Sequence, residues 1–225
     1  MVGWSRRTPT GRPSTGEHDA VAESGRRRVV TTARVCLASR SPRRRALLEQ
    51  IGVACVVVDP SIDESLRPGE SPRELVVRLA RGKALAGREL PAAAGMVVVA
   101  ADTEVVLDDA VLGKPADAAD AEAMLARLSG RAHEVLSAVA VLAPDDAEPR
   151  VRVSASRVWF RPTTAAERKA YCATGEPLDK AGAYGIQGRA AVFVERLDGS
   201  YSGVMGLPLH ETATLLARAG IDVLG

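Results

Sequence analysis

The stretch MVVVAADTEVVLDDAVLGKP, residues 96–115, decides the fold of this chain. Its first six residues, 96–101, are all apolar and do not alternate with polar side chains, which predicts a strand buried on both faces of a sheet. Asp102 and Thr103 follow at or near the end of that strand. Because α/β proteins gather chemistry at the carboxyl edge of their strands, Asp102 is a candidate catalytic carboxylate; the alternative is a residue that caps a turn.

The same stretch carries a lysine that could return to this carboxylate. Two short strands, 105–107 and 111–112, are predicted around the turn 108–110, and Lys114 lies in the Gly-Lys-Pro that follows. A carboxylate beside a lysine suits a metal-bound, phosphorylated substrate.

Composition limits the class of protein. With 225 residues and 46% hydrophobic residues, the chain can bury a core as one large domain or two small ones. The net charge is +2, but residues 1–30 hold six arginines against three acids, so the remainder sums to −1. We therefore expect no nucleic-acid binding by the folded part. No apolar run approaches the roughly 20 residues of a membrane span, so no membrane association is expected.

Cysteine and histidine are few and scattered. The three cysteines show no CxxC spacing, which is typical of reduced thiols in a cytoplasmic protein. The three histidines are equally dispersed, so any metal would be held by oxygen ligands, which favours Mg²⁺ or Mn²⁺.

Residues 1–32 are rich in Arg, Ser, Thr, Gly and Pro and lack apolar periodicity, which predicts a disordered arm. No apolar segment follows Arg6 and Arg7, which argues against a secretory or twin-arginine signal. A solvated tail is favoured over an arm that binds acidic surfaces.

A strand, a turn and a helix follow the arm. Residues 35–38 form the predicted strand, and Ser41 as N-cap with Pro42 behind it begins a helix that Gly52 ends. Three arginines, 43–45, crowd the helix N-terminus, where the helix dipole prefers acids. A phosphate bound there by backbone N–H groups, arginines and the hydroxyls of Ser39 and Ser41 would resolve this conflict, and we favour it over a solvated arginine run.

Further elements supply more charged candidates. A strand over 53–58 leads to the acidic loop 59–65, where Glu64 or Asp63 is a candidate metal-side carboxylate, although a solvent-facing loop is the default. A capping box at Ser71 begins a helix that runs to about Arg88. Lys83 lies on or beside its apolar face, where a lysine usually extends its amine to solvent and less often binds phosphate.

The second half of the chain is predicted to contain helices over 117–128 and 164–175, a hairpin of strands 133–143 and 150–160, a strand over 191–197 and a last helix through 216. Between them, the segment 179–188 interleaves three glycines with Asp179, Lys180 and Gln187. Glycines there permit a close approach of the backbone to a ligand.

Together these side chains suit hydrolysis of a phosphoanhydride. A metal would lower the pKa of a water molecule, Asp102 would accept its proton, and the cations would stabilise charge on the leaving phosphates. Neither a Walker A motif nor a Rossmann glycine fingerprint is present.

Five motifs in order give this chain a resemblance to a known family. They are LASRSPRRRALLEQIGV (37–53), DPSIDES (59–65), AADTEVVLDDAVLGKP (100–115), LDKAGAYGIQG (178–188) and SYSGVMGLPL (200–209). They resemble the motifs of the Maf family of nucleoside triphosphate pyrophosphatases. The resemblance implies an α/β fold with a long twisted mixed sheet flanked by helices and a central cleft, similar to inosine triphosphate pyrophosphatases. It also implies a domain over 33–225, a homodimer, and cleavage of a nucleoside triphosphate to the monophosphate and pyrophosphate with a divalent cation.

Site roles follow from the same resemblance. Asp102 matches the proton acceptor, with Glu64 and Asp102 at the metal and Lys114 completing the catalytic set. The positions that match the phosphate and metal surroundings are Ser39, Arg44, Glu64, Lys83 and Lys114, and those that match base choice are Arg43, Thr103 and Gln187. Asp179 and Lys180 are further substrate-binding candidates.

The family has a dTTP/UTP branch and a 7-methyl-GTP branch. The Arg-Arg pair after Pro42, Asp102-Thr103 and the Ile-Gln-Gly around Gln187 resemble the first branch; the second typically has an aromatic residue in the pair, Asp-Gln and Ser-Glu-Gly. A glutamine amide can pair with O4 and N3–H of thymine or uracil. Two alternatives stay open: a 7-methyl-GTP pyrophosphatase, and a non-catalytic nucleotide-binding regulator of cell division.

Overall fold

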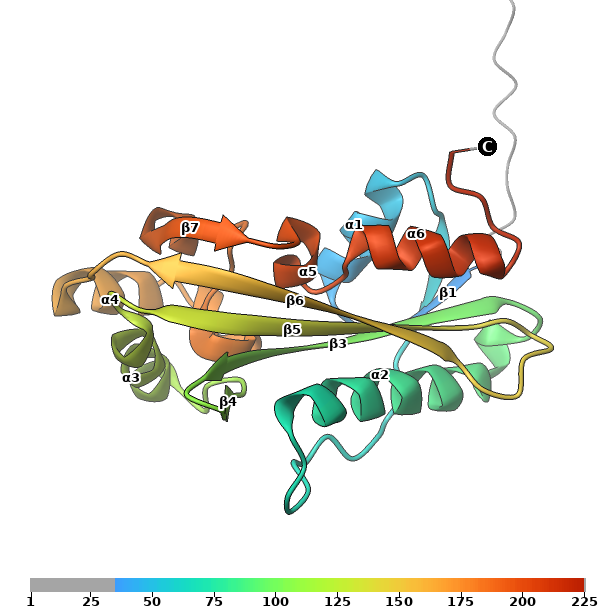
Figure 1. The fold of residues 1–225 in the computed structure, drawn as a ribbon, viewed down its shortest axis with the longest axis horizontal. Coiled ribbons are helices and arrows are strands. Elements are labelled where there is room, and N and C mark those ends of the chain that lie inside the picture. The colour runs from blue at the N-terminus through green and yellow to red at the C-terminus, as the bar shows by residue number, and fades with distance from the viewer. Residues whose placement is uncertain (1–34, 225) are drawn as a thin grey trace, which may run out of the picture. The chain divides into compact units, whose positions relative to one another are not determined.

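A computed structural model describes residues 35–224; the predicted arm over 1–32 lies outside the described residues. The strands form one mixed sheet in the order β2-β1-β3-β5-β6-β7, with β4 paired to β3 (Figure 1). β1 runs parallel to β2 and β3, and the remaining pairs are antiparallel. The strands are β1 (Val35–Ala38), β2 (Cys55–Val58), β3 (Val97–Leu107), β4 (Ala110–Leu112), β5 (Ala132–Leu142), β6 (Arg150–Phe160) and β7 (Val194–Asp198).

Helices flank the sheet, which confirms the predicted fold class. They are α1 (Pro42–Gln50), α2 (Pro72–Arg88), α3 (Ala118–Leu128), α4 (Ala165–Cys172), α5 (Tyr201–Met205) and α6 (Leu209–Arg218), with short 3-10 turns at Pro91–Ala93, Glu176–Asp179, Ala181–Ala183 and Arg189–Phe193. No helix in the described part is long and apolar enough to cross a membrane.

The predicted helix starts are confirmed by their caps. The Ser41 hydroxyl accepts from the Arg44 amide, with Pro42 in the first turn. Reciprocal capping boxes begin α2 at Ser71 and α4 at Thr164. Each cap satisfies backbone N–H groups that a helix leaves unpaired, which is why short side-chain motifs fix these boundaries.

The central strand differs from its prediction. β3 continues without a break from Val97 to Leu107, and Asp102 pairs with Ala138 of β5 in the middle of the strand. Asp102 therefore neither ends a strand nor caps a turn. The strand that ends beside this part of β3 is β1. It pairs with β3 only at Val97–Val99 and ends at Ala38. Beyond that point one edge of β3 is free of a neighbour until β4 begins.

Two apolar layers cover the β1 half of the sheet. α2 packs its apolar face, including Val76, Ala80 and Ala84, against one side, while α1 and α6 cover the other side (Figure 1). α2 lies close to β1 because Gly87 has no side chain: a Cβ there would stand 2.7 Å from the Ala38 Cβ. The depth at which α2 lies on the sheet is thus set by a glycine.

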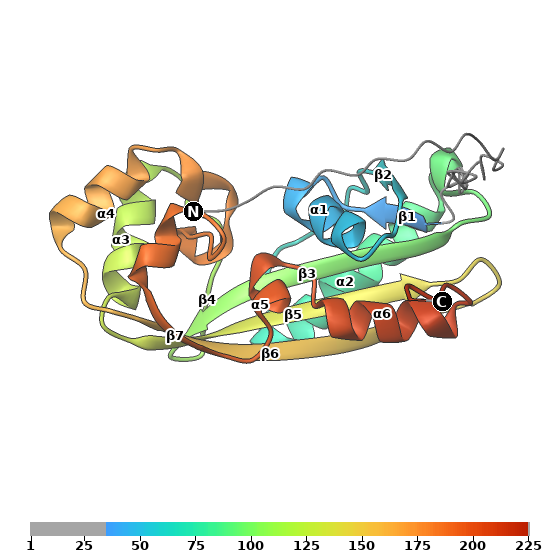
Figure 2. The same ribbon diagram turned by 90° about the horizontal axis from the view of Figure 1, so that it is seen from above.

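A third apolar cluster fills the other end of the sheet. There α3 and α4 gather beside β4 and the 3-10 turns (Figure 2). Its centre is aromatic, with His133, Phe160 and Tyr184 in edge-to-face contact and the His133 Nε2 hydrogen-bonded to the Tyr184 hydroxyl at 2.8 Å. Burial lowers the His133 pKa to about 4, so this ring stays neutral and structural.

Three boundaries in the C-terminal half and near β2 differ from prediction. β2 begins at Cys55 rather than at 53, and the strand expected over 191–197 is a 3-10 turn followed by β7. The short helix α5 before the last helix was not predicted; the Ser200 hydroxyl accepts from the Gly203 amide and caps it. At α5 a single capping side chain sets the start of the helix, a local contact that the apolar pattern does not show.

Candidate active site

A cavity of about 700 Å³ opens where β1 ends, around the free edge of β3. Its walls come from the start of α1, the loop before α2, the middle of β3, the turn after β4 and the segment 179–187. Asp63, the alternative to Glu64, does not line it, whereas all the other residues predicted for the site do: Ser39, Arg43, Arg44, Glu64, Lys83, Asp102, Thr103, Lys114, Asp179, Lys180 and Gln187. The predicted central cleft is confirmed, and distant parts of the sequence meet in it.

Lys83 binds the carboxylates at the floor of the cavity. Its Nζ lies 2.8 Å from Asp102 Oδ1 and 2.8 Å from Glu64 Oε1. The lysine and Asp102 side chains are only 11% and 8% exposed, whereas that of Glu64 is 50% exposed. The default interpretation, in which Lys83 extends to solvent, is therefore wrong: α2 directs it under the cavity.

Glu64 keeps its negative charge in this setting. Burial opposes ionisation, but the hydrogen bond from Lys83 and the nearby charges of Lys114 and Arg44 outweigh it and lower the pKa of Glu64. The acidic loop is thus anchored into the cavity at Glu64, although a solvent-facing loop was the default expectation.

The arginine-rich turn forms the opposite wall. Arg44 donates from Nε to the Gly206 carbonyl at 2.8 Å and from Nη1 to Ser39 Oγ at 3.1 Å. Burial lowers its pKa from the ordinary arginine value. Because Ser39 Oγ also accepts from the Ser41 amide, its own proton stays available to donate to a ligand.

The three arginines are not equivalent. Arg43 and Arg44 line the cavity, whereas Arg45 pairs with Glu49 on the exposed side of α1. The first turn of α1 holds no acidic residue. No carboxylate of that turn therefore neutralises the backbone amides and the two guanidinium groups that face the cavity. This arrangement suits phosphate oxygens.

The segment 179–187 closes the far side of the cavity. Lys180 Nζ donates to Asp179 Oδ1 at 2.6 Å, and Arg43 Nη1 donates to Asp179 Oδ2 at 2.9 Å. Burial opposes ionisation of Asp179, but these two hydrogen bonds hold its pKa below the usual value. Asp179 therefore joins the segment to the arginine turn across the cavity.

The glycines of this segment lie where a side chain would not fit. A Cβ on Gly182 would stand 2.9 Å from Val105, and one on Gly185 would stand 2.8 Å from the Lys180 side chain. They permit close packing of the segment against β3 and against itself. Gln187, beside Gly185, is exposed and borders the cavity.

Thr103 points to the other face of β3 from Asp102. Its Oγ1 lies 2.9 Å from Ser137 Oγ and 3.5 Å from the Gly206 carbonyl, the same carbonyl that holds Arg44. Ser137 in turn donates to the Gly203 carbonyl at 2.6 Å. Sequence reasoning missed Ser137, whose pairing with Thr103 depends on the register of β3 and β5.

Glu104 was also missed. It lines the same cavity, and burial, followed by the charge of Asp102, raises its pKa to about 8. The signal was present: a strand alternates faces with period two, so Glu104 shares the face of Asp102. It was hidden because the strand was expected to end near Asp102.

The donor set fits a hard divalent cation. Glu64, Asp102 and Glu104 offer carboxylate oxygens, and Asp102 Oδ2 and Glu104 Oε2 are buried without a hydrogen-bond partner among the described residues. In that part of the chain no three His, Cys, Asp or Glu side chains are grouped closely enough to hold a metal alone. Magnesium sites that use one or two carboxylates together with substrate phosphates match this pattern.

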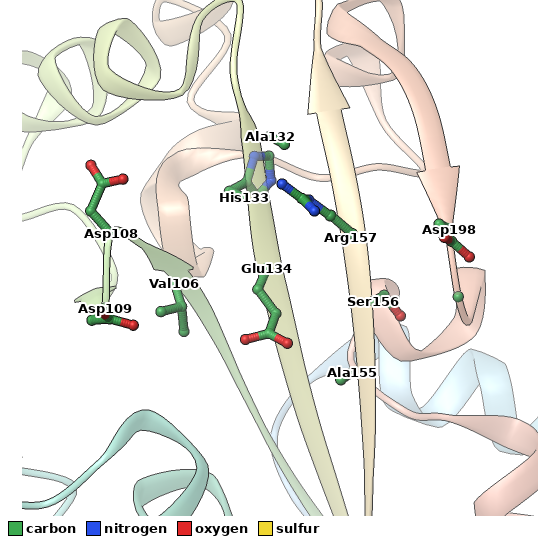
Figure 3. A pocket seen from close by; sticks show the side chains of 11 residues that line it. Val106, Asp108, Asp109, Ala132, His133, Glu134, Ala155, Ser156, Arg157 and Asp198 are labelled. Atoms are coloured by element: carbon green, nitrogen blue, oxygen red, sulfur yellow. The ribbon is translucent and has the colours of Figure 1, made fainter.

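A second hollow, of about 560 Å³, lies on the sheet beyond the N-terminal end of α2. Figure 3 shows Glu134 on β5 between Asp108 and Asp109 on one side and Arg157 and Asp198 on the other. Asp108 is paired with Arg131 at 2.7 Å in an exposed position. No residue predicted for the site lies in this hollow.

Comparison with known proteins adds independent findings. Curated relatives described as dTTP/UTP pyrophosphatase include one from Chromobacterium violaceum, 50% identical over 193 residues, and one from Bordetella avium, 54% identical over 198 residues; each alignment covers 84% of this chain and 96% of the relative. Among solved structures, a nucleoside-triphosphatase (dITP/XTP pyrophosphatase) from Mycobacterium abscessus aligns over 56% of this chain and 72% of its own, with 26% identity and a TM-score of 0.37.

The sequence profile of the family described as Maf-like protein matches residues 34–219, which include every segment that lines the cavity. The match covers most of the chain. The alignments with the relatives at 50% identity or more cover nearly the whole length of each relative. The chain belongs to the Maf family.

Proposed function

We propose that this protein hydrolyses dTTP and UTP to the nucleoside monophosphate and pyrophosphate. The observation that carries the proposal is the meeting, in one cavity, of an arginine-rich helix start, a buried lysine–carboxylate network and an exposed glutamine. The relatives described as dTTP/UTP pyrophosphatase support this choice of substrate.

The cationic wall would bind the triphosphate. Arg44 is fixed by Gly206 and Ser39, so its remaining donors need little reordering when phosphate oxygens arrive. Lys114, on the turn after β4, and the α1 amides add positive charge around the same space. These groups would stabilise the charge that develops on the leaving pyrophosphate.

Asp102 would act as the base. Lys83 holds its Oδ1, which leaves both lone pairs of Oδ2 available, one for the cation and one to accept a proton from the attacking water. A divalent cation, Mg²⁺ or Mn²⁺, bound by Asp102 and Glu64 would supply a water of lowered pKa and neutralise phosphate charge. Lys83 holds Oδ1 of Asp102 and Oε1 of Glu64 in place.

Base choice would rest on Gln187, with Arg43 and Thr103 near it. The glutamine amide offers one donor and one acceptor, which match O4 and N3–H of a thymine or uracil ring. The position of Thr103, hydrogen-bonded to Ser137 and near Gly206, supports an indirect part for it, through the wall that holds Arg44.

The proposal includes the extent of the catalytic domain, its oligomeric state and its location in the cell. The domain over 33–225 would carry the activity as a cytoplasmic homodimer that needs no nucleic acid, in keeping with the near-neutral charge of that part of the sequence. Analytical ultracentrifugation of the full chain tests the dimer directly.

Pyrophosphate release from dTTP, UTP, CTP, GTP and 7-methyl-GTP, with Mg²⁺ or Mn²⁺ and with EDTA, tests the activity. We expect preferential turnover of dTTP and UTP that EDTA abolishes. Asp102→Asn should lower the rate about a thousandfold, within the range for loss of a general base, while the unfolding midpoint stays close to that of the wild type.

Other outcomes separate the alternatives. A preference for 7-methyl-GTP would contradict the reading of Gln187 and Thr103 and leave the mechanism intact. Nucleotide binding without turnover would favour the regulatory protein. Turnover by Asp102→Asn at the wild-type rate would remove Asp102 from the role of base.

A further inference from the structure

Two carboxylate oxygens in the cavity are buried and lack a partner. Asp102 is 5% exposed, and its Oδ2 has no hydrogen bond among the described residues, although its Oδ1 is bound by Lys83. Glu104 Oε2 is in the same condition. Burying a polar atom without a partner costs free energy, so a pair of them in one cavity points to a ligand.

The backbone of β3 brings these two oxygens to the same side. Asp102 and Glu104 are two residues apart in a regular antiparallel pairing with β5, opposite Ala138 and Leu136. Side chains two apart on a strand share a face, about 6.6 Å apart along it. This spacing leaves room for one small cation with an oxygen from each side chain.

Of the two lysines whose charge acts on Glu104, Lys83 is committed to other carboxylates, and Lys114 makes no salt bridge with Glu104 among the described residues. Lys83 is shared between Asp102 Oδ1 and Glu64 Oε1, both at 2.8 Å. No salt bridge within residues 35–224 reaches Glu104. A divalent cation between Asp102 Oδ2 and Glu104 Oε2 would satisfy both oxygens and balance the local charge.

We propose that Glu104 is a ligand of the divalent cation, which it binds together with Asp102 Oδ2. This goes beyond the pair Asp102 and Glu64 taken from the family resemblance. Glu64 is half exposed, lies on a loop and is occupied by Lys83, whereas Glu104 is fixed on the same strand as Asp102. Glu64 Oε1 then holds Lys83 in position, in addition to the place of Glu64 at the cation.

The inference rests on the proposed function for its cation but is tested without turnover. Mn²⁺ binding is measured by electron paramagnetic resonance on the full chain, alone and with the non-hydrolysable analogue α,β-imido-dUTP. We expect Glu104→Gln to weaken Mn²⁺ binding by about tenfold or more, since even outer-shell partners of a metal are worth about 10- to 100-fold. The substitution keeps the size of the side chain and removes one charge.

Glu134→Gln is the matched control, because Glu134 lies on the neighbouring strand β5, is exposed and borders only the second hollow. We expect it to bind Mn²⁺ as the wild type does. Circular dichroism of both variants checks that the fold is kept, and Glu104→Asp, which retains the charge on a shorter side chain, should recover part of the affinity.

Equal Mn²⁺ affinity in wild type and Glu104→Gln would overturn the inference, as would a wild type that binds no Mn²⁺ with or without the analogue. A wild type that binds Mn²⁺ through Glu104 yet releases no pyrophosphate from dTTP or UTP would contradict the proposed function alone and support the ligand assignment.

Discussion

The two hollows of this molecule border the same two strands, β3 and β5, and both contain carboxylates, but they differ in how those carboxylates are held. In the cavity beside β1, Asp102 is buried and bound to Lys83, whose side chain is 11% exposed. In the hollow of Figure 3, Asp108 is exposed and its partner Arg131 is half exposed.

Burial of charge, rather than the number of acids, therefore distinguishes the candidate site. A charge removed from water must be compensated by partners or a ligand, whereas an exposed pair is solvated and contributes little.

The largest effect is expected from Lys83→Met, which keeps the aliphatic stem and removes the charge. Asp102 would then be buried without its cation, so we expect a loss of about 3 kcal/mol in the free energy of unfolding. Urea denaturation measures it. Arg131→Met removes the cation of the exposed pair and should cost less than about 1 kcal/mol; equal losses would contradict the distinction.

A pH dependence should follow from Glu104. Its folded pKa of about 8 lies above the unfolded value, so the folded state binds the extra proton and stability falls as the pH rises between those two values. Each pH unit removes about 1.4 kcal/mol, so metal-free wild type should lose about 2 kcal/mol relative to Glu104→Gln between about pH 5.5 and 7.0.

The measurement is chemical denaturation of both proteins in EDTA across that interval. Taking the difference cancels the contribution of His133, which is common to the two. The exposed Glu134, replaced by glutamine, should show no such difference, and a flat wild-type curve would contradict the burial of Glu104.

A smaller effect is expected from Ser137→Ala, on the wall that holds Arg44. The substitution removes one of the two donors to the Gly203 carbonyl, which keeps the Gly206 amide, and it removes the partner of Thr103, which should cost about 1 kcal/mol. Because Gly206 positions Arg44, we expect the KM for dTTP to rise severalfold with little change in kcat. A fall in kcat alone would argue against a positioning role.

The smallest effect is expected from Asp108→Asn in the second hollow. Asp108 has a φ of 52°, a conformation that asparagine also tolerates, and its ion pair is exposed. Stability should change by less than about 0.5 kcal/mol, as measured by thermal unfolding, and dTTP turnover should not change. A loss of turnover would mean that the two hollows are coupled.

Local signals predicted most of the fold. Ser41 with Pro42 and the capping box at Ser71 determined helix starts because a cap is a contact among a few neighbouring residues. The end of the central strand could not be predicted in this way. Asp102, Thr103 and Glu104 are polar, and only their pairing with β5 keeps the strand continuous.

The same contrast between local and long-range contacts applies to the candidate site. Side-chain chemistry and the family resemblance identified the residues that line the cavity, but not the hydrogen bonds and ion pairs that these residues form with one another. The Lys83–Asp102 contact depends on how α2 lies on the sheet, and the part of Ser137 depends on strand register. Both are long-range properties that no short motif encodes.

Because the Lys83–Asp102 contact depends on how α2 lies on the sheet, a mutation at Gly87 has a consequence for genetics. Replacing a helical glycine by alanine ordinarily favours the helix by about 1 kcal/mol, so a Gly87→Ala allele would be classed as harmless from sequence alone. Yet the added methyl would meet Ala38 and lift α2 from β1, and Lys83 stands one turn away on the same helix. A loss-of-function allele is thus expected at a residue that does not line the cavity.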